Sequence, residues 1–163
     1  MDEELKQRLI PFLGRQHLCA SLTVREVETF LDFTDLVRFR KGEVIAEVGE
    51  VGEALYVVLR GEVGFHYDNA GRELEVGVAR EGELVGEMSF FDRRPRSLRI
   101  RAKAPRTELL RLSRPMYQRL KVERPFIAVN LLEQAIISLD RLLRQVSAEE
   151  ASLAHYVYGP GRR

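Results

Sequence analysis

The chain has 163 residues, of which 45% are hydrophobic and 31% charged, a balance typical of one globular domain with appendages and not of a disordered chain. Its formal net charge of +1 argues against a dedicated nucleic-acid-binding protein, which usually carries a basic excess. The single Cys19 excludes an internal disulfide, and no signal peptide or membrane-spanning run is visible, so we expect a cytoplasmic protein without membrane contact.

Two helices are predicted ahead of the first strand, and we assign residues 1–34 to an N-terminal helical segment. Apolar residues recur at helical spacing within residues 2–14: Leu5, Leu9, Phe12 and Leu13. A second helix is expected to start at Thr23, which forms a capping box with Glu26. The expected buried stripe of this second helix is Val24, Val27, Phe30 and Leu31.

From Asp35 the hydrophobic period changes from helical to alternating. The two-residue repeats are Val37 and Phe39; Leu55, Val57 and Leu59; Val63, Phe65 and Tyr67; and Leu74, Val76 and Val78. Glycine-containing turns separate them, at Gly42, Gly61, Gly71 and Gly82. We therefore predict an α+β, mainly β chain, in which residues 35–113 form an antiparallel β-roll or jelly roll of about eight strands. The N-terminal helices and a long C-terminal helix would flank this roll.

Two further helices are expected over residues 114–147. Ser113 is placed to cap a brief helix from Pro115 to Leu120, and a long helix begins near Pro125 and runs to about Val146. An apolar seam at heptad spacing follows the long helix: Val129, Leu132, Ile136, Leu139, Leu143 and Val146. A second stripe runs alongside it: Ala128, Leu131, Ala135, Ser138 and Leu142. One stripe can cover the roll, so the other predicts a parallel homodimer; burial wholly against its own domain is the alternative.

Residues 86–101 carry the strongest functional signal. Gly86 allows a close approach of the backbone to a ligand, and the start of a helical turn presents free N–H groups. The guanidinium of Arg96 is a planar fork that matches phosphate oxygens. Glu87 is suited to accept hydrogen bonds from a sugar hydroxyl. Together these residues indicate a site for a nucleotide whose phosphate and ribose lie close together.

This stretch resembles the phosphate-binding cassette of cyclic nucleotide-binding domains. The residues that fit the pattern are Gly86, Glu87, Met88, Ser89, Phe90, Phe91, Pro95, Arg96 and Ser97. The likeness extends over about residues 15 to 147. The resemblance implies that residues 86–98 bind cAMP or cGMP, with Arg96 and Ser97 on the phosphate and Glu87 and Gly86 on the ribose. The ligand-binding residues that it implies are Gly86, Glu87, Met88, Ser89, Arg96, Ser97 and Leu98.

The same resemblance suggests where the base would lie. Counting along the long helix, the usual polar base contacts fall near Ser138, Leu142 and Leu143, and Arg141 or Arg144 would substitute for the missing polar groups. The possible base or lid residues are therefore Ser138, Arg141 and Leu142. Residues 148–163 form a tail in which Tyr156 and Tyr158 would either fold over the base or pack on the surface.

Two positions depart from the family pattern. Leu98 stands where the family has a small alanine, and Arg99 stands where it has threonine or serine. The extra carbons of Leu98 predict overpacking of about 1–3 kcal/mol. In the strand that follows, alternation places Arg99, Arg101 and Lys103 on one face, which we interpret as a solvated strand face. A patch for anionic lipid or nucleic acid is the alternative.

No P-loop, catalytic nucleophile or metal-ligand spacing is visible, so we expect neither an enzyme nor a metal or cofactor. The first hypothesis is a freestanding cyclic-nucleotide sensor, homodimeric, that passes its signal to a downstream protein. The second is a degenerate domain in which Leu98 plugs the site and the fold binds another protein without ligand. A DNA-binding regulator is third, because the residues after Ser147 leave no room for a DNA-binding domain.

Overall fold

The computed structural model describes residues 1–158, apart from the side chains of residues 142, 145, 146 and 149–158. The N-terminal segment contains α1 (Glu3–Leu13), the short 3₁₀ helix η1 (His17–Cys19) and α2 (Val24–Asp32). The predicted capping box of α2 is confirmed, with Thr23 and Glu26 bonded reciprocally. The placement of Val24 in the buried stripe was wrong: Val24 is the first residue of α2, directly after the N-cap, and is 69% exposed.

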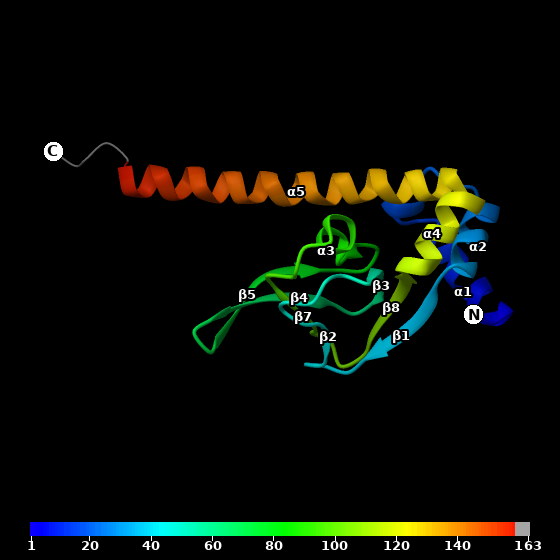
Figure 1. Cartoon of the computed structure of the whole chain (residues 1–163), viewed down its shortest axis with the longest axis horizontal. Helices are drawn as coiled ribbons and strands as arrows, with labels where there is room; N and C mark the ends of the chain where they lie inside the picture. Colours follow the sequence, from blue (N-terminus) through cyan, green and yellow to red (C-terminus); the bar gives the residue numbers. More distant parts are fainter. Residues whose placement is uncertain (159–163) are drawn as a thin grey trace.

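Eight antiparallel strands form two four-stranded sheets in the described chain, which confirms the predicted β-roll (Figure 1). One sheet has the order β1-β8-β3-β6 and the other the order β2-β7-β4-β5. The strands are β1 (Asp35–Phe39), β2 (Val44–Ala46), β3 (Ala54–Arg60), β4 (Val63–Asn69), β5 (Arg72–Ala79), β6 (Leu84–Val85), β7 (Arg99–Ala102) and β8 (Thr107–Ser113).

The turn glycine at Gly61 shows why the hairpins fold where the sequence predicts. Gly61 has a φ of +84° and joins β3 to β4. A Cβ at this position would lie 2.8 Å from the backbone oxygen of Arg106. Both the left-handed conformation and the close approach therefore require glycine at this turn.

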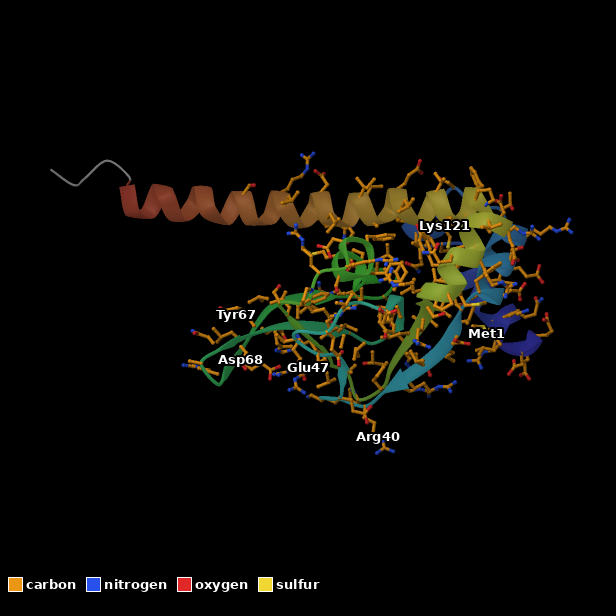
Figure 2. The ribbon with its side chains drawn as sticks, in the orientation of Figure 1. Met1, Arg40, Glu47, Tyr67, Asp68 and Lys121 are labelled. Carbon is orange, nitrogen blue, oxygen red and sulfur yellow. The ribbon has the colours of Figure 1, made fainter. Side chains whose placement is uncertain are left out.

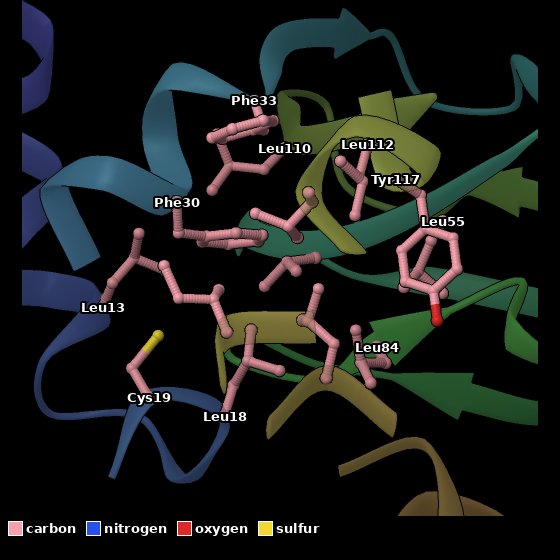
Figure 3. Close-up of a cluster of buried hydrophobic side chains, with 14 of the residues drawn as sticks. Leu13, Leu18, Cys19, Phe30, Phe33, Leu55, Leu84, Leu110, Leu112 and Tyr117 are labelled. Atoms are coloured by element: carbon pink, nitrogen blue, oxygen red, sulfur yellow. The ribbon is translucent and has the colours of Figure 1, made fainter. Parts of the chain in front are cut away.

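The β1-β8-β3-β6 sheet is buried on both faces. Val58, Val85 and Leu109 point into the roll, where they meet side chains of the other sheet such as Ile100. The opposite face of the same sheet packs against the helices, through Leu55, Leu84, Leu110 and Leu112 among others, as Figure 3 shows. Strand β3 is consequently buried at alternate positions on both sides, so the roll and the helices form one continuous core.

The helices after the roll are α4 (Arg114–Glu123) and α5 (Pro125–Tyr158). Ser113 caps α4 as predicted, since its hydroxyl accepts from the N–H of Met116. Helix α5 continues past Val146, near which we expected it to end. It runs past α3 (Glu87–Asp92) and extends beyond the roll (Figure 1). Within residues 1–158, no helix is both long enough and apolar enough to cross a membrane.

The two apolar stripes of α5 have different surroundings. Ala128, Leu131 and Ala135 are buried at 1–3% exposure against the domain. The heptad seam faces outward: Val129 is 48% exposed, Ile136 65% and Leu143 66%. The prediction that one stripe covers the roll is confirmed for these side chains. The alternative, in which the whole helix is buried in its own domain, is wrong.

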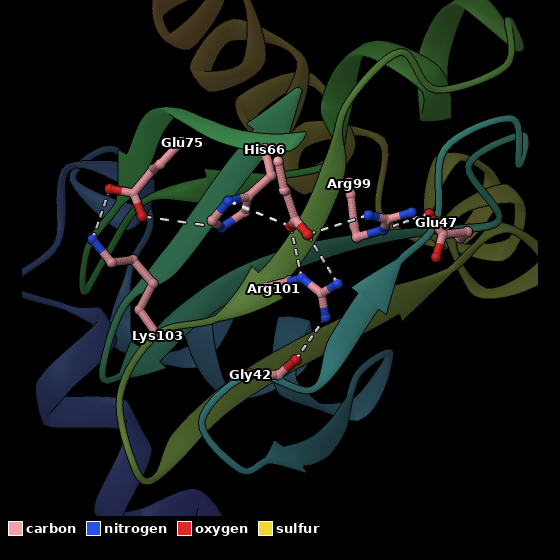
Figure 4. A network of polar contacts seen from close by, with 8 residues as sticks. Gly42, Glu47, His66, Glu75, Arg99, Arg101 and Lys103 are labelled. Carbon is pink, nitrogen blue, oxygen red and sulfur yellow. Dashed lines mark hydrogen bonds and ion pairs between the residues drawn. The ribbon is translucent and has the colours of Figure 1, made fainter. Parts of the chain in front are cut away.

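The basic face of β7 is neutralised by acidic side chains of β5 and of the loop after β2 (Figure 4). Arg99 donates to Glu47 at 2.7 Å, and Arg101 donates to Glu73 at 2.7 Å. Lys103 lies 2.8 Å from Glu75. These basic side chains are only 21–31% exposed, so the face is a half-buried ion-pair network and not the solvated face that we expected. The positive charge that a lipid or nucleic-acid patch would need is already paired.

Candidate functional site

The site begins where β6 ends. Gly86 follows β6 with a φ of +87° and forms the N-cap of α3. A Cβ on Gly86 would lie 3.3 Å from both Nη atoms of Arg96, and a Cβ on Gly52 would lie 2.9 Å from Nη2 of the same guanidinium. Two glycines from separate loops therefore make room for the Arg96 head group. The sequence-predicted Gly86 and Arg96 meet in space, as expected.

Ser89 ties the two loops of the site together. Its buried hydroxyl accepts from the Gly52 N–H at 2.7 Å and donates to the backbone oxygen of Arg94 at 2.6 Å. The loop after α3 is fixed further by two backbone bonds: Arg96 N–H donates to Glu50 at 2.9 Å, and Gly49 N–H donates to Arg96 at 2.8 Å. Because the Ser89 hydroxyl is used within the protein, its role is to position Arg96.

Arg114 is a residue of this site that the sequence did not indicate. Its guanidinium donates to the carbonyl oxygens of Gly52 and Phe90, the latter at 2.9 Å. It also lies 4.5 Å from the centroid of the Phe90 ring, a cation–π contact. Arg114 thus fastens α3 to the loop that precedes β3. Its position after the α4 cap carries no local signal for this role, which depends on tertiary packing.

The Arg96 guanidinium is half-buried and has no hydrogen bond or ion pair to any residue of the described chain. Burial lowers the pKa of Arg96, while the nearby Tyr56, Glu50 and Glu87 act in the opposite direction. Removing a charged group from water without a partner is unfavourable. An anion placed against this guanidinium would supply the missing partner.

Glu87 lies beside Arg96 at the start of α3. Burial raises the pKa of the Glu87 carboxyl, opposed by its own backbone N–H, by Ser138 and by Arg96. The hydroxyl of Ser138 on α5 donates to Glu87 at 2.9 Å. One turn further along α5, Arg141 forms an ion pair with Glu83 at 2.9 Å. Two of the three predicted base or lid residues therefore contact the rim of the site.

The remaining predicted residues differ in their surroundings. Ser97 is exposed, Met88 is 55% exposed, and Leu98 is half-buried without belonging to either core cluster. The side chains of Leu142, Val146, Tyr156 and Tyr158 lie outside the described residues. The half-buried Leu98 follows directly after Ser97, on the segment that carries Arg96.

Comparison with known proteins identifies the family. The family described as "Cyclic nucleotide-binding domain" matches residues 36–123, which is more than half of the chain. This chain belongs to the cyclic nucleotide-binding domain family. The β-roll with its flanking helices is the fold of that class.

Individual relatives agree with this assignment. The chain is 31% identical over 105 residues to a cAMP-dependent protein kinase regulatory subunit of Emericella nidulans, covering 63% of this chain and 25% of that protein. The chain thus spans about a quarter of the length of this curated relative. The crystal structure of the Thermus thermophilus catabolite activator protein superposes with a TM-score of 0.69 at 33% identity, covering 84% of this chain and 62% of that one.

A third similar structure is the N-terminal domain of a transcriptional regulator from Streptomyces coelicolor. It matches with a TM-score of 0.66 at 32% identity, over 83% of this chain and 94% of that chain. The fold predicted from alternation and turn spacing is thus the fold of these regulatory proteins. Families of this kind are regulatory rather than catalytic.

Proposed function

We propose that this domain binds a cyclic mononucleotide, cAMP or cGMP, and acts as a regulatory sensor. The observation that carries the proposal is the Arg96 guanidinium, half-buried above Gly52 and Gly86 without an acidic partner in the described chain. Arginine forms short, charge-assisted hydrogen bonds with phosphate oxygens. Ser97, exposed next to Arg96, would donate a further hydrogen bond to the same phosphate.

The ribose would lie on the opposite side of the site. Glu87 has a carboxylate that can accept several hydrogen bonds, of which Ser138 uses one. A ribose hydroxyl would take another. Gly86 is buried beside the Arg96 guanidinium, and its φ of +87° is a conformation that favours glycine. Several similar proteins carry cAMP or cyclic AMP in their names, among them the kinase regulatory subunit of Emericella nidulans and a receptor protein of Thermus thermophilus. These names support cAMP as the first ligand to test.

Thermal unfolding with added ligand tests the proposal. A ligand at about 100 times its dissociation constant stabilises the folded state by about 2.7 kcal/mol, which for a domain of this size raises Tm by about 5–11 °C. We expect this increase with cAMP or cGMP for the wild type and none for Arg96→Ala. The matched control is Arg94→Ala, an exposed arginine of the same loop, which should keep the increase. No shift for the wild type at about 1 mM ligand contradicts the proposal.

We infer that α5 reports occupancy of the site to a downstream protein. The helix contacts the site through Ser138 on Glu87 and through Arg141 on Glu83. A ligand that engages Glu87 changes the balance of these contacts, and so the preferred position of α5. Hydrogen exchange of α5 with and without cAMP should differ around Ser138; equal exchange in both states contradicts this inference.

We also propose that two copies pair through the exposed seam of α5. Isolated apolar side chains on a surface are common, but a continuous stripe marks an interaction site. Analytical ultracentrifugation should show a dimer for the wild type and a monomer for the double variant Ile136→Glu/Leu143→Glu. Glu133→Gln, on the same helix, should stay dimeric. A wild type that is monomeric at about 100 μM contradicts this pairing.

A second candidate function is a ligand-independent interaction domain in the cytoplasm. Leu98 favours it, because a half-buried leucine stands next to Ser97 where the family pattern has alanine. In that case neither cAMP nor cGMP binds at any concentration tested, and Leu98→Ala restores binding. Calorimetry on both proteins separates the two functions.

A further inference from the structure

Two neighbouring clefts lie beside β1, one of them where α1 meets β1, β3 and β8, and none of their lining residues belongs to residues 86–98. The first cleft has a volume of about 360 Å³ and runs between α1 and these strands. The second has a volume of about 520 Å³ and lies between the end of β1 and the β7–β8 turn. Arg38 and Arg106 line both clefts, so the two lie side by side. We call this surface the arginine groove.

Arginines dominate the rim of the groove: Arg8, Arg38, Arg40, Arg60 and Arg106. Figure 2 shows Arg40 projecting from the surface at one end. Three glutamates line the same clefts: Glu43, Glu81 and Glu108. The local excess of positive charge contrasts with the net charge of only +1 for the whole chain.

The acidic residues of the groove leave much of this charge unpaired. Arg38 and Arg106 share a single oxygen of Glu108, at 3.2 and 2.7 Å. Glu81 accepts from the backbone N–H of Gly61, 3.3 Å away. Arg8 and Arg60 have no ion pair within the described part of the chain. The rim therefore presents guanidinium groups that are available to carboxylates of a partner.

The floor of the groove is apolar. Leu9, Phe12 and Leu36 are only partly buried and lie at the edge of the main core cluster, where they line the first cleft. The half-buried Phe39 and the exposed Pro105 add apolar surface to the second cleft. A surface that only attracted phosphates would need no such floor. An occupant must therefore combine acidic groups with apolar side chains.

We propose that the arginine groove binds an acidic amphipathic segment of a partner protein. Two neighbouring clefts that share Arg38 and Arg106 offer more surface than one small molecule would cover. Arginine is also enriched among residues that dominate interface energies. Apolar side chains of the segment would contact Leu9 and Phe12, and its carboxylates would pair with Arg8 and Arg60. This inference goes beyond the proposed nucleotide function and does not depend on it, since the two surfaces share no residue.

A binding assay with defined peptides tests the chemistry. The probe is a fluorescein-labelled peptide of about 12 residues built from glutamate and leucine pairs, titrated with the full chain. One comparison peptide has every glutamate replaced by glutamine, and another has every leucine replaced by serine. The variant is Arg8→Glu/Arg60→Glu. Its matched control is Arg25→Glu/Arg72→Glu, two exposed arginines outside the groove with the same change in net charge.

We expect the glutamate–leucine peptide to bind the wild type and the control variant equally. The groove variant should bind at least about tenfold more weakly, as should both comparison peptides with the wild type. Amide shifts on peptide addition should map to α1 and β1, with cAMP binding unchanged. Equal weakening in both variants, absence of binding at about 1 mM peptide, or tighter binding of a DNA duplex than of the peptide would overturn the proposal.

Discussion

The hydroxyl of Ser89 is the internal brace of the site, and its removal gives the sharpest test of how the site is built. Ser89 is 5% exposed and bridges the Gly52 N–H and the Arg94 carbonyl. Each such hydrogen bond contributes about 0.5–1.5 kcal/mol net, and a buried N–H left without an acceptor costs about 1–3 kcal/mol. Because Gly52 is itself buried, Ser89→Ala should destabilise the fold by about 2–4 kcal/mol.

Urea unfolding followed by circular dichroism measures this loss, which corresponds to a decrease in Tm of about 5–15 °C. The matched control is Ser97→Ala, which removes an exposed hydroxyl of the same cassette that has no hydrogen bond in the described chain. Ser97→Ala should leave the free energy of unfolding within about 0.5 kcal/mol of wild type. It should instead lower cAMP affinity by about ten- to a hundredfold, since a hydrogen bond to a charged phosphate is lost. A Ser89→Ala loss below about 0.5 kcal/mol refutes the bracing role.

Leu98→Ala should tighten cAMP binding by about 5- to 150-fold in calorimetry, if relief of overpacking returns about 1–3 kcal/mol; unchanged affinity shows that Leu98 does not crowd the ligand. Burial raises the pKa of the Cys19 thiol to about 12. A disulfide reagent at about pH 8 should therefore label Cys19 in the native protein only as fast as local unfolding exposes the thiol. Immediate labelling without urea contradicts this. The bond from Arg101 holds the pKa of Glu73 below its usual range, so Glu73→Gln should be less stable than wild type at neutral pH. That difference should shrink as the pH falls from about 4.3, the unfolded pKa, through the folded pKa; a urea midpoint difference that persists at about pH 2 contradicts the sign.

Local chemistry explains which parts of the fold were predictable. Thr23 and Ser113 indicate helix starts, because their side chains cap the next turn. Glycines such as Gly61 indicate turns, because they adopt a positive φ readily. The end of α5 carries no such signal near Val146, because the residues that follow favour helix and the next breaker is Gly159. The helix accordingly continues to Tyr158.

The residues of the site could be predicted from the sequence only where they belong to one continuous motif. Gly86, Glu87 and Arg96 are close in sequence and form a recognisable pattern. Gly52 and Arg114 act through contacts between residues far apart in the sequence. Gly52 bonds to Ser89, 37 residues away, and Arg114 bonds to Phe90, 24 residues away. The pairing of Arg101 with Glu73 likewise requires the register of strands that are not adjacent in sequence. Such contacts follow from the assembled fold.

The first turns of α5 are fixed to the N-terminal segment, whereas its C-terminal part extends beyond the roll. Near the root, the buried Asn130 donates to the backbone oxygen of Leu18 at 2.6 Å and fastens the helix to the N-terminal segment. The 34 residues of α5 correspond to a rod of about 51 Å. The part of the helix beyond Asn130 is about 42 Å long, so a swing of about 10° around that anchorage would displace the far end by about 7 Å. If α5 reports occupancy as proposed, a small adjustment beneath Ser138 would be amplified into a larger displacement at the far end of the helix.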